Sequence, residues 1–184
     1  MIFNKTPLEG AYTIDMTPFK DNRGFFGRTF CANEFSQHNL KTNMVQTNHS
    51  GSFGIGLIRG MHYQRPPYAE VKLIKCVKGA IFDVIVDIRK GSPTFLKWFG
   101  AELTAENKTM MYVPEGFAHG FQALTEECEL IYQVSAFYNK ESEGGIRFND
   151  PKINIEWKLG VSLTSEKDAN WDLLDDNFEG LSLL

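Results

Sequence analysis

Alternation of apolar and polar residues is clearest in residues 71–88, V-K-L-I-K-C-V-K-G-A-I-F-D-V-I-V-D-I. Lysines alternate with apolar residues before Gly79. After it, one side of the run reads Ile-Asp-Ile-Asp and the other reads Phe-Val-Val-Ile. A period of two in a run rich in Val and Ile predicts β-strands. The Lys78-Gly79 step between the two halves predicts a tight hairpin turn.

Shorter runs of the same kind follow, each bounded by residues typical of turns. They predict further strands at 95–103, 109–113, 117–123 and 128–137. Helical patterns are few, and predict one short helix at 31–39 and another at 164–174, with Thr164 or Ser165 as its N-cap. Many short strands with few helices predict an all-β fold, a sandwich or barrel flanked by minor helices.

Length, charge and cysteine content narrow the class of protein. A chain of 184 residues corresponds to one domain, here 1–184. Nineteen Lys and Arg against 23 Asp and Glu give a net charge of −4, without the basic excess that nucleic-acid binding needs. No apolar run is long enough for a transmembrane helix, and the start lacks the pattern of a secretory signal. Three widely spaced cysteines, Cys31, Cys76 and Cys128, are typical of reduced thiols in a cytoplasmic protein.

Two of the four histidines lie in unusual company. His62 stands in I-R-G-M-H-Y-Q, with Arg59 before it, Gln64 after it and Lys72 at the start of the next predicted strand, while His119 stands in V-P-E-G-F-A-H-G-F. Alternation along strands can place such side chains together inside a barrel. Cations and imidazoles at a barrel mouth predict an anion-binding and proton-transfer site. Each histidine alone is equally compatible with a hydrogen-bonded structural role.

A metal site is the competing interpretation. His62, Gln64, Glu70 and His119 resemble the ligand set of metal-binding cupins, with Gln64 in place of a second histidine. An amide is a poor ligand for a first-row metal, and Lys72 would repel a cation nearby. We therefore expect no metal and no other cofactor.

Eight short stretches, in the same order, closely resemble the dTDP-4-dehydrorhamnose 3,5-epimerase family across about residues 3–175. The stretches are 21–26, 45–50, 58–64, 82–95, 113–121, 131–138, 148–151 and 165–168. The resemblance implies a cupin jelly roll, a homodimer that exchanges N-terminal strands, and no metal. It also implies a nucleotide-linked 4-keto-6-deoxyhexose as substrate, in deoxysugar or O-antigen-type polysaccharide biosynthesis. The tail at 176–184 is acidic and then apolar, and we expect it to lie loosely or to pack on the partner.

The family's chemistry suits these residues. A ketone at C4 acidifies the protons on C3 and C5, so inversion needs a base on one face, an acid on the other and a cation near the developing oxyanion. By resemblance, His62 is the base, Tyr132 the acid, Lys72 the cation, and Asp168 the partner that orients His62. Asp168 could instead cap a helix, although Ser165 is available for that.

The resemblance also implies residues that bind substrate. Arg23 and Arg59 match diphosphate contacts, and Tyr138 matches the ring that stacks on the nucleobase. The remaining polar contacts are Gln46, Asn48, His119, Glu143 and Lys167. Asp83 could pair with His119 across the barrel, or be a buried structural acid.

Some positions depart from the family pattern within segments expected to line the substrate pocket. Arg28 replaces a Glu, Thr47 replaces an Asp, and Ala69-Glu70-Val71 replaces a Gln-Gly pair. These departures leave open a CDP- or GDP-linked sugar, and inversion at C3, C5 or both. A 3,4-ketoisomerase, a metal-dependent cupin enzyme and a non-catalytic sugar-nucleotide binding module also remain as alternatives.

Overall fold

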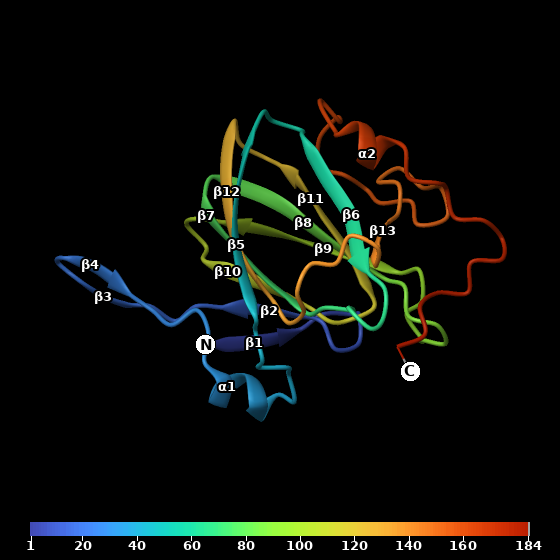
Figure 1. The fold of residues 1–184 in the computed structure, drawn as a ribbon. Coiled ribbons are helices and arrows are strands. Elements are labelled where there is room, and N and C mark those ends of the chain that lie inside the picture. Colours follow the sequence, from blue (N-terminus) through green and yellow to red (C-terminus); the bar gives the residue numbers. More distant parts are fainter. Residues whose placement is uncertain (184) are drawn as a thin grey trace.

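The computed structural model describes residues 1–183, and two antiparallel sheets packed face to face form its body (Figure 1). The six-stranded sheet has the order β1 (Ile2–Lys5), β2 (Tyr12–Asp15), β10 (Thr109–Val113), β7 (Lys72–Lys78), β12 (Glu127–Val134), β5 (Gln46–Phe53). The five-stranded sheet has the order β13 (Glu143–Gly145), β6 (Ile58–Gln64), β11 (Phe117–Ala123), β8 (Ala80–Asp87), β9 (Trp98–Thr104). The predicted all-β sandwich is confirmed.

Strands β7 to β12 agree with the predicted runs, whereas β1 to β6 and β13 were not predicted. The predicted hairpin at Lys78-Gly79 is wrong. β7 pairs with β10 and β12, whereas β8 pairs with β11 and β9 in the opposite sheet. Gly79, at φ +69°, is the corner where the chain crosses between sheets. Both runs carry an apolar side, and crossing lets both sides face one core.

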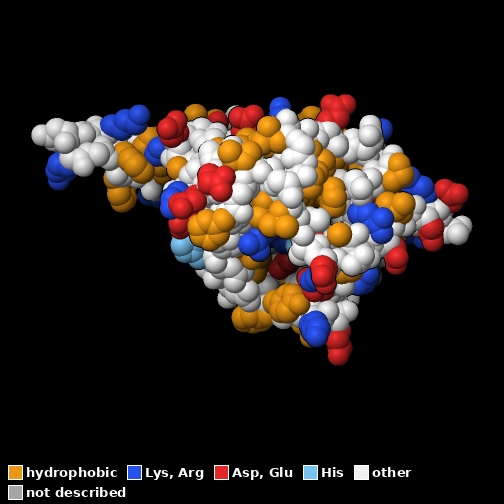
Figure 2. All heavy atoms as spheres, turned by 90° about the horizontal axis from the view of Figure 1, so that it is seen from above, with side chains coloured by type: hydrophobic (Ala, Val, Ile, Leu, Met, Phe, Trp, Pro, Cys, Tyr) orange, Lys and Arg blue, Asp and Glu red, His pale blue; other side chains and the backbone are white. Residues whose placement is uncertain are grey.

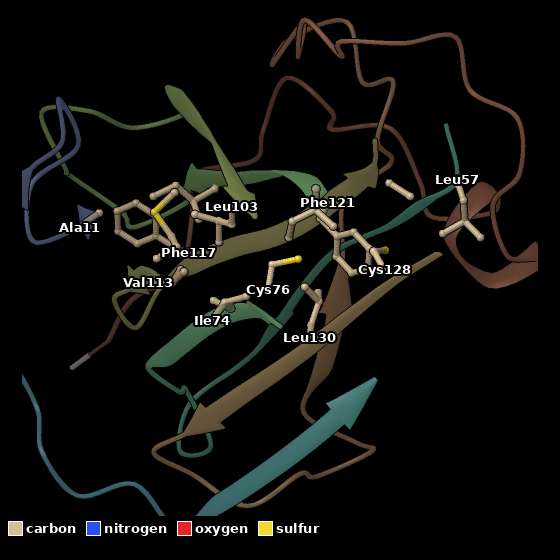
Figure 3. Packing of buried hydrophobic residues seen from close by; sticks show 14 of the residues in the cluster. Ala11, Leu57, Ile74, Cys76, Leu103, Val113, Phe117, Phe121, Cys128 and Leu130 are labelled. Atoms are coloured by element: carbon tan, nitrogen blue, oxygen red, sulfur yellow. The ribbon is translucent and has the colours of Figure 1, made fainter. Parts of the chain in front are cut away.

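That core is filled by alternate residues of both sheets. Ile74 and Leu130 reach it from the six-stranded sheet, and Ile85, Leu103 and Phe121 reach it from the five-stranded sheet. Figure 3 shows side chains from β7 and β12 pointing toward those from β9 and β11. Strand periodicity therefore fixes which residues are buried, and polar residues at the same alternating positions near the strand ends also face inward.

The C-terminal tail packs on its own chain over residues 176–183, so the expectation that it lies loosely is wrong, while contact with a partner stays a prediction. The Phe178 ring stacks on Phe95 with centroids 6.0 Å apart, and the Leu181 N–H donates to the Ile88 carbonyl at 2.6 Å. The reason is the second apolar side of β8, which carries Phe82 and Val84 and would otherwise face water.

The two helices are short. α1 (Ala32–Gln37) lies within the predicted range, while α2 (Glu166–Ala169) is shorter than the predicted 164–174. Ser165 is the N-cap of α2, because its hydroxyl accepts the Asp168 N–H at 3.0 Å. Within residues 1–183, no helix is long and apolar enough to cross a membrane.

A separate hairpin, β3 (Phe19–Asp21) with β4 (Gly24–Phe26), stands clear of the sandwich in both views (Figures 1 and 2). The side chains of Phe19, Phe25 and Phe26 are exposed along it. Packing within one chain buries little of the apolar surface of this hairpin. The hairpin is therefore a candidate surface for contact with another protein chain.

We predict that Gly79→Ala destabilises the protein by about 2 kcal/mol or more. A methyl group there would overlap the Glu127 carbonyl and the Thr125 hydroxyl, at a φ that favours glycine. Gly91→Ala is the matched control, because its φ of +76° is similar but no atom lies within 4 Å. It should cost only about 1 kcal/mol. Urea unfolding measures both, and equal losses would contradict the close approach at this corner.

Candidate active site

A pocket lies at the end of the sandwich where β6 and β12 end and where β5, β7 and β13 begin. Figure 2 shows acidic and basic side chains close together around a hollow on the face seen from above. The polar and aromatic residues lining the pocket are Gln46, Asn48, His62, Tyr63, Gln64, Glu70, Lys72, Tyr132, Tyr138 and Glu143. The predicted base, acid and cation therefore share one pocket.

His62 is held by Asp168 across 106 residues of sequence. Nε2 of His62 lies 2.6 Å from Oδ1 of Asp168, and Oδ2 of Asp168 accepts the Gly60 N–H at 3.2 Å. Burial opposes the charged carboxylate. The His62 contact, the Gly60 N–H and the Ser165 hydroxyl outweigh that effect and lower the pKa of Asp168. The ionised carboxylate can only accept, so Nε2 carries the proton and Nδ1 has the free lone pair.

Local backbone geometry brings these groups together. Ser165 caps α2 and leaves the Asp168 carboxylate free to face His62, so the cap and the partner of His62 are different residues. Gly60, at φ +127°, lies so close to Gly120 that a side chain at either position would collide with the other strand. This close approach brings β6 against β11, where His62 lies directly opposite His119.

Tyr132 faces the pocket because it shares an inward face with its cross-strand neighbours. In register it lies opposite Asn48 of β5 and opposite Ile74 of β7, a core residue. Lys72 and Gln46 lie opposite Val134, two residues further along the same face. Burial and the nearby Glu70 charge raise the pKa of Tyr132, against smaller opposing effects of Arg59 and Asn48. The phenol is therefore kept protonated.

Tyr138, Glu143 and Lys167 form a polar cluster at the rim. The Tyr138 hydroxyl donates to Oε2 of Glu143 at 3.1 Å, and Nζ of Lys167 lies 2.5 Å from Oε1 of the same carboxylate. Burial alone would raise the pKa of Glu143. The contacts with Lys167 and Tyr138 together outweigh burial, so the pKa of Glu143 is lowered. The Tyr138 ring itself is exposed and available for stacking.

A second imidazole–carboxylate pair lies beside the first. Nε2 of His119 is 2.7 Å from Oδ1 of Asp83, a fully buried residue. The pair joins the adjacent strands β11 and β8, rather than spanning the barrel as anticipated. Each member of the metal-like set is thus engaged: His62 by Asp168, His119 by Asp83, Glu70 by Lys72 at 3.3 Å, and Gln64 by the Tyr68 carbonyl and the Asn139 N–H. Within residues 1–183, no three His, Cys, Asp or Glu side chains form a group suited to a metal.

Six predicted substrate residues do not line this pocket in the single chain: His119 and Lys167, described above, and Arg23, Arg28, Thr47 and Arg59. The side chain of Arg23 is 86% exposed on the β3–β4 hairpin, and Arg28 pairs with Glu34. Thr47 is exposed because it alternates with Gln46 and Asn48 and so faces the other way. Arg59 donates to the Ser52 hydroxyl and the Gly51 carbonyl, and lines a second hollow that also touches His62.

Sequence analysis missed Tyr63 as a pocket residue. It named Gln64 in the polar group around His62 but gave it no part in substrate binding, and it considered Glu70 only as a metal ligand and a departure from the family pattern. Gln64 is held by its amide, which donates to the Tyr68 carbonyl at 2.9 Å and accepts the Asn139 N–H at 2.7 Å. The position of Glu70, two residues before Lys72, was the available signal, because alternation can return both side chains to one face.

A jelly roll whose pocket joins an oriented imidazole, a protonated phenol and an ammonium group defines a proton-transfer isomerase. Comparison with known proteins agrees. A profile of the dTDP-4-dehydrorhamnose 3,5-epimerase family matches residues 5–176. The Shigella flexneri protein of that name is 48% identical over 167 residues, which cover 90% of this chain and 92% of the relative. The chain belongs to the dTDP-4-dehydrorhamnose 3,5-epimerase family.

Solved structures confirm the cupin fold. The epimerase of Elizabethkingia anophelis superposes with a TM-score of 0.92 at 43% identity, covering 97% of this chain and 98% of that one. The Legionella pneumophila enzyme, solved with dTDP-4-keto-L-rhamnose, gives 0.91 at 36% identity and covers 98% of both chains. The predicted family, fold and enzyme class are therefore confirmed, while the individual residue roles stay predictions.

We predict that Asp168→Asn changes the pH dependence of stability. The pKa of Asp168 is lowered below its ordinary 3.8, so its stabilisation is fully present above that pH and is lost as pH falls through the folded-state pKa. The variant should be less stable at neutral pH by about 1 kcal/mol or more, and the difference should shrink in acid. Urea unfolding across pH measures this.

Asp176→Asn is the matched control, because Asp176 contacts Lys152 at the surface and its side chain is 99% exposed. The Lys152 ammonium also lowers the pKa of Asp176, but water screens so exposed a pair, so this variant should change the pH profile much less than Asp168→Asn does. A profile for Asp168→Asn that also follows the wild type would contradict a stabilising contact with His62.

Proposed function

We propose that the protein epimerises a dTDP-linked 4-keto-6-deoxyhexose, of the dTDP-4-dehydro-6-deoxyglucose type, at C3 and C5 in deoxysugar biosynthesis. The observation that carries the proposal is that His62, Tyr132 and Lys72 line one pocket. The ligand named for the Legionella structure supports thymidine, rather than cytidine or guanosine, as the nucleoside of the substrate.

His62 begins the reaction. Asp168 holds the Nε2–H, so Nδ1 is the base that removes a proton from the carbon beside the ketone. The bonding electrons move toward the C4 oxygen and form an enolate. The Lys72 ammonium stabilises the negative charge that develops there, and Asp168 stabilises the imidazolium that forms.

Tyr132 completes the inversion. Its phenol returns a proton to the carbon from the opposite face, which gives the inverted centre and a phenolate. Exchange of protons with solvent then restores the neutral imidazole and the phenol. Because burial and Glu70 raise the pKa of Tyr132, the acid is protonated at the start of each cycle.

The working unit that we propose is a homodimer. The aromatic hairpin supports this, since Phe19, Phe25 and Phe26 are all more than half exposed within residues 1–183, although the Lys108 ammonium lies over the Phe25 ring. Arg23 and Arg28 lie on or next to this arm, so a partner would receive the diphosphate and base contacts that one chain alone does not assemble. We further propose a cytoplasmic location, supported by three free cysteines, two of them buried.

We predict that His62→Ala and Tyr132→Phe each slow product formation by about a hundredfold or more. The matched controls are His49→Ala, on the outer side of β5, and Tyr12→Phe, on β2, and both should keep the wild-type rate. NMR of the product from dTDP-4-dehydro-6-deoxyglucose measures the rate and shows whether the ketone stays at C4. A ketone found at C3 of the product would favour a 3,4-ketoisomerase. Full activity in both pocket variants would contradict the assigned roles.

We predict that the double variant Phe25→Asp/Phe26→Asp shifts the protein from dimer to monomer, because two charges on the arm oppose burial. Sedimentation velocity measures the shift. Phe53→Asp, at another exposed aromatic on β5, is the matched control and should leave the dimer intact. A wild type that sediments as a monomer at micromolar concentration would contradict the proposed assembly.

A further inference from the structure

Glu70 lies in the pocket, but the steps above give it no part in positioning the reacting groups. It immediately precedes β7 and lines the pocket with His62, Lys72 and Tyr132. Its side chain is 11% exposed, and Oε1 lies 3.3 Å from Nζ of Lys72, whose side chain is 12% exposed. Burial raises the pKa of Glu70, despite the opposing charges of Lys72 and His119. A buried carboxylate opposes folding, and such groups concentrate at functional sites.

The contact between Glu70 and Lys72 leaves the ammonium available. At 3.3 Å it is longer than the roughly 2.7–2.9 Å of a strong charge-assisted hydrogen bond. An ammonium has three N–H donors, so one directed at Glu70 leaves two for a substrate oxygen. Glu70 therefore fixes where the Lys72 charge lies without occupying it fully.

Glu70 also acts on the phenol opposite the base. Its negative charge adds to burial in raising the pKa of Tyr132. The other ionisable groups that line the pocket are His62 and Tyr63 from β6, Lys72 from β7, Glu143 from β13 and Tyr138. The charges of Arg59 from β6 and His119 from β11 act from outside this lining. Of these, Arg59 opposes the effect of Glu70.

We propose that Glu70 is a positioning residue of this site. Its carboxylate anchors the Lys72 ammonium beside the reacting ketone, and its buried charge acts on the Tyr132 phenol in the same pocket. The proposal rests on the proposed epimerase function, and it accounts for a charged residue in the segment where the chain departs from the family pattern.

Glu70→Gln tests this, because it keeps the shape and removes the charge. We expect kcat to fall about tenfold with little change in KM. The basic limb of the kcat profile, where Tyr132 loses its proton, should move to lower pH, because the Glu70 charge helps to raise the pKa of Tyr132. Glu70→Asp should restore the limb. Glu106→Gln, the same charge change in the exposed turn between β9 and β10, should match the wild type.

A second readout separates this proposal from the epimerase assignment. The ultraviolet absorbance of tyrosinate is titrated in each protein, and the same titration of its Tyr132→Phe variant is subtracted. Glu70→Gln should lower the pH at the midpoint of the Tyr132 titration, whether or not the protein turns over the sugar nucleotide. If the wild type turned over no substrate but this midpoint still fell, the epimerase assignment would fail and the effect of Glu70 on Tyr132 would stand. An unchanged rate, limb and midpoint would overturn the proposal. Thermal unfolding at neutral pH should show Glu70→Gln no less stable than the wild type, because the charge it removes opposes folding.

Discussion

The hydrogen bond between His62 and Asp168 is the contact on which the pocket depends. It joins β6 to the short helix α2 near the C-terminus, 106 residues later in the chain, at 2.6 Å. The Gly60 N–H donates to the carboxylate and holds it in place. The Ser165 hydroxyl caps the helix through the Asp168 N–H, so the carboxylate itself is not needed as a cap. Since a carboxylate with a lowered pKa only accepts hydrogen bonds, the same contact decides which nitrogen of the neutral imidazole keeps a free lone pair. Fold and chemistry thus meet in one interaction.

Strand geometry accounts for the other side of the pocket. Tyr132, Asn48, Gln46 and Lys72 lie at alternating positions of neighbouring strands, so they share the face that carries Ile74 into the core. Toward the middle of the sandwich that face is apolar and closed. At the strand ends it becomes polar and open, and the residues there meet β6 and β13 of the other sheet. The pocket is therefore a continuation of the core in which polar side chains replace apolar ones.

Much of this arrangement could be predicted from the sequence, because period-two alternation and short ordered motifs are local signals. They located β7 to β12 closely and pointed to His62, Lys72, Tyr132 and Asp168. Alternation gives the face of a strand but not its partner, which is why the crossing at Gly79 was taken for a hairpin. The tail after residue 175 was expected to be loose because the surface on which it packs, the second apolar side of β8 in the same chain, is distant in sequence. The roles predicted for Arg23 and Arg28 stay predictions, because neither side chain lines the pocket of a single chain.

Deuterium exchange in heavy water, measured separately from inversion, tests the two-sided mechanism most directly. With dTDP-4-dehydro-6-deoxyglucose, Tyr132→Phe should still exchange the proton beside the ketone, because His62 removes and returns it on one face. It should give little inverted sugar, since the opposite face has lost its acid. His62→Ala should lose both exchange and inversion. Inversion by Tyr132→Phe at the wild-type rate, or exchange by His62→Ala at that rate, would contradict the placement of base and acid on opposite sides of the substrate.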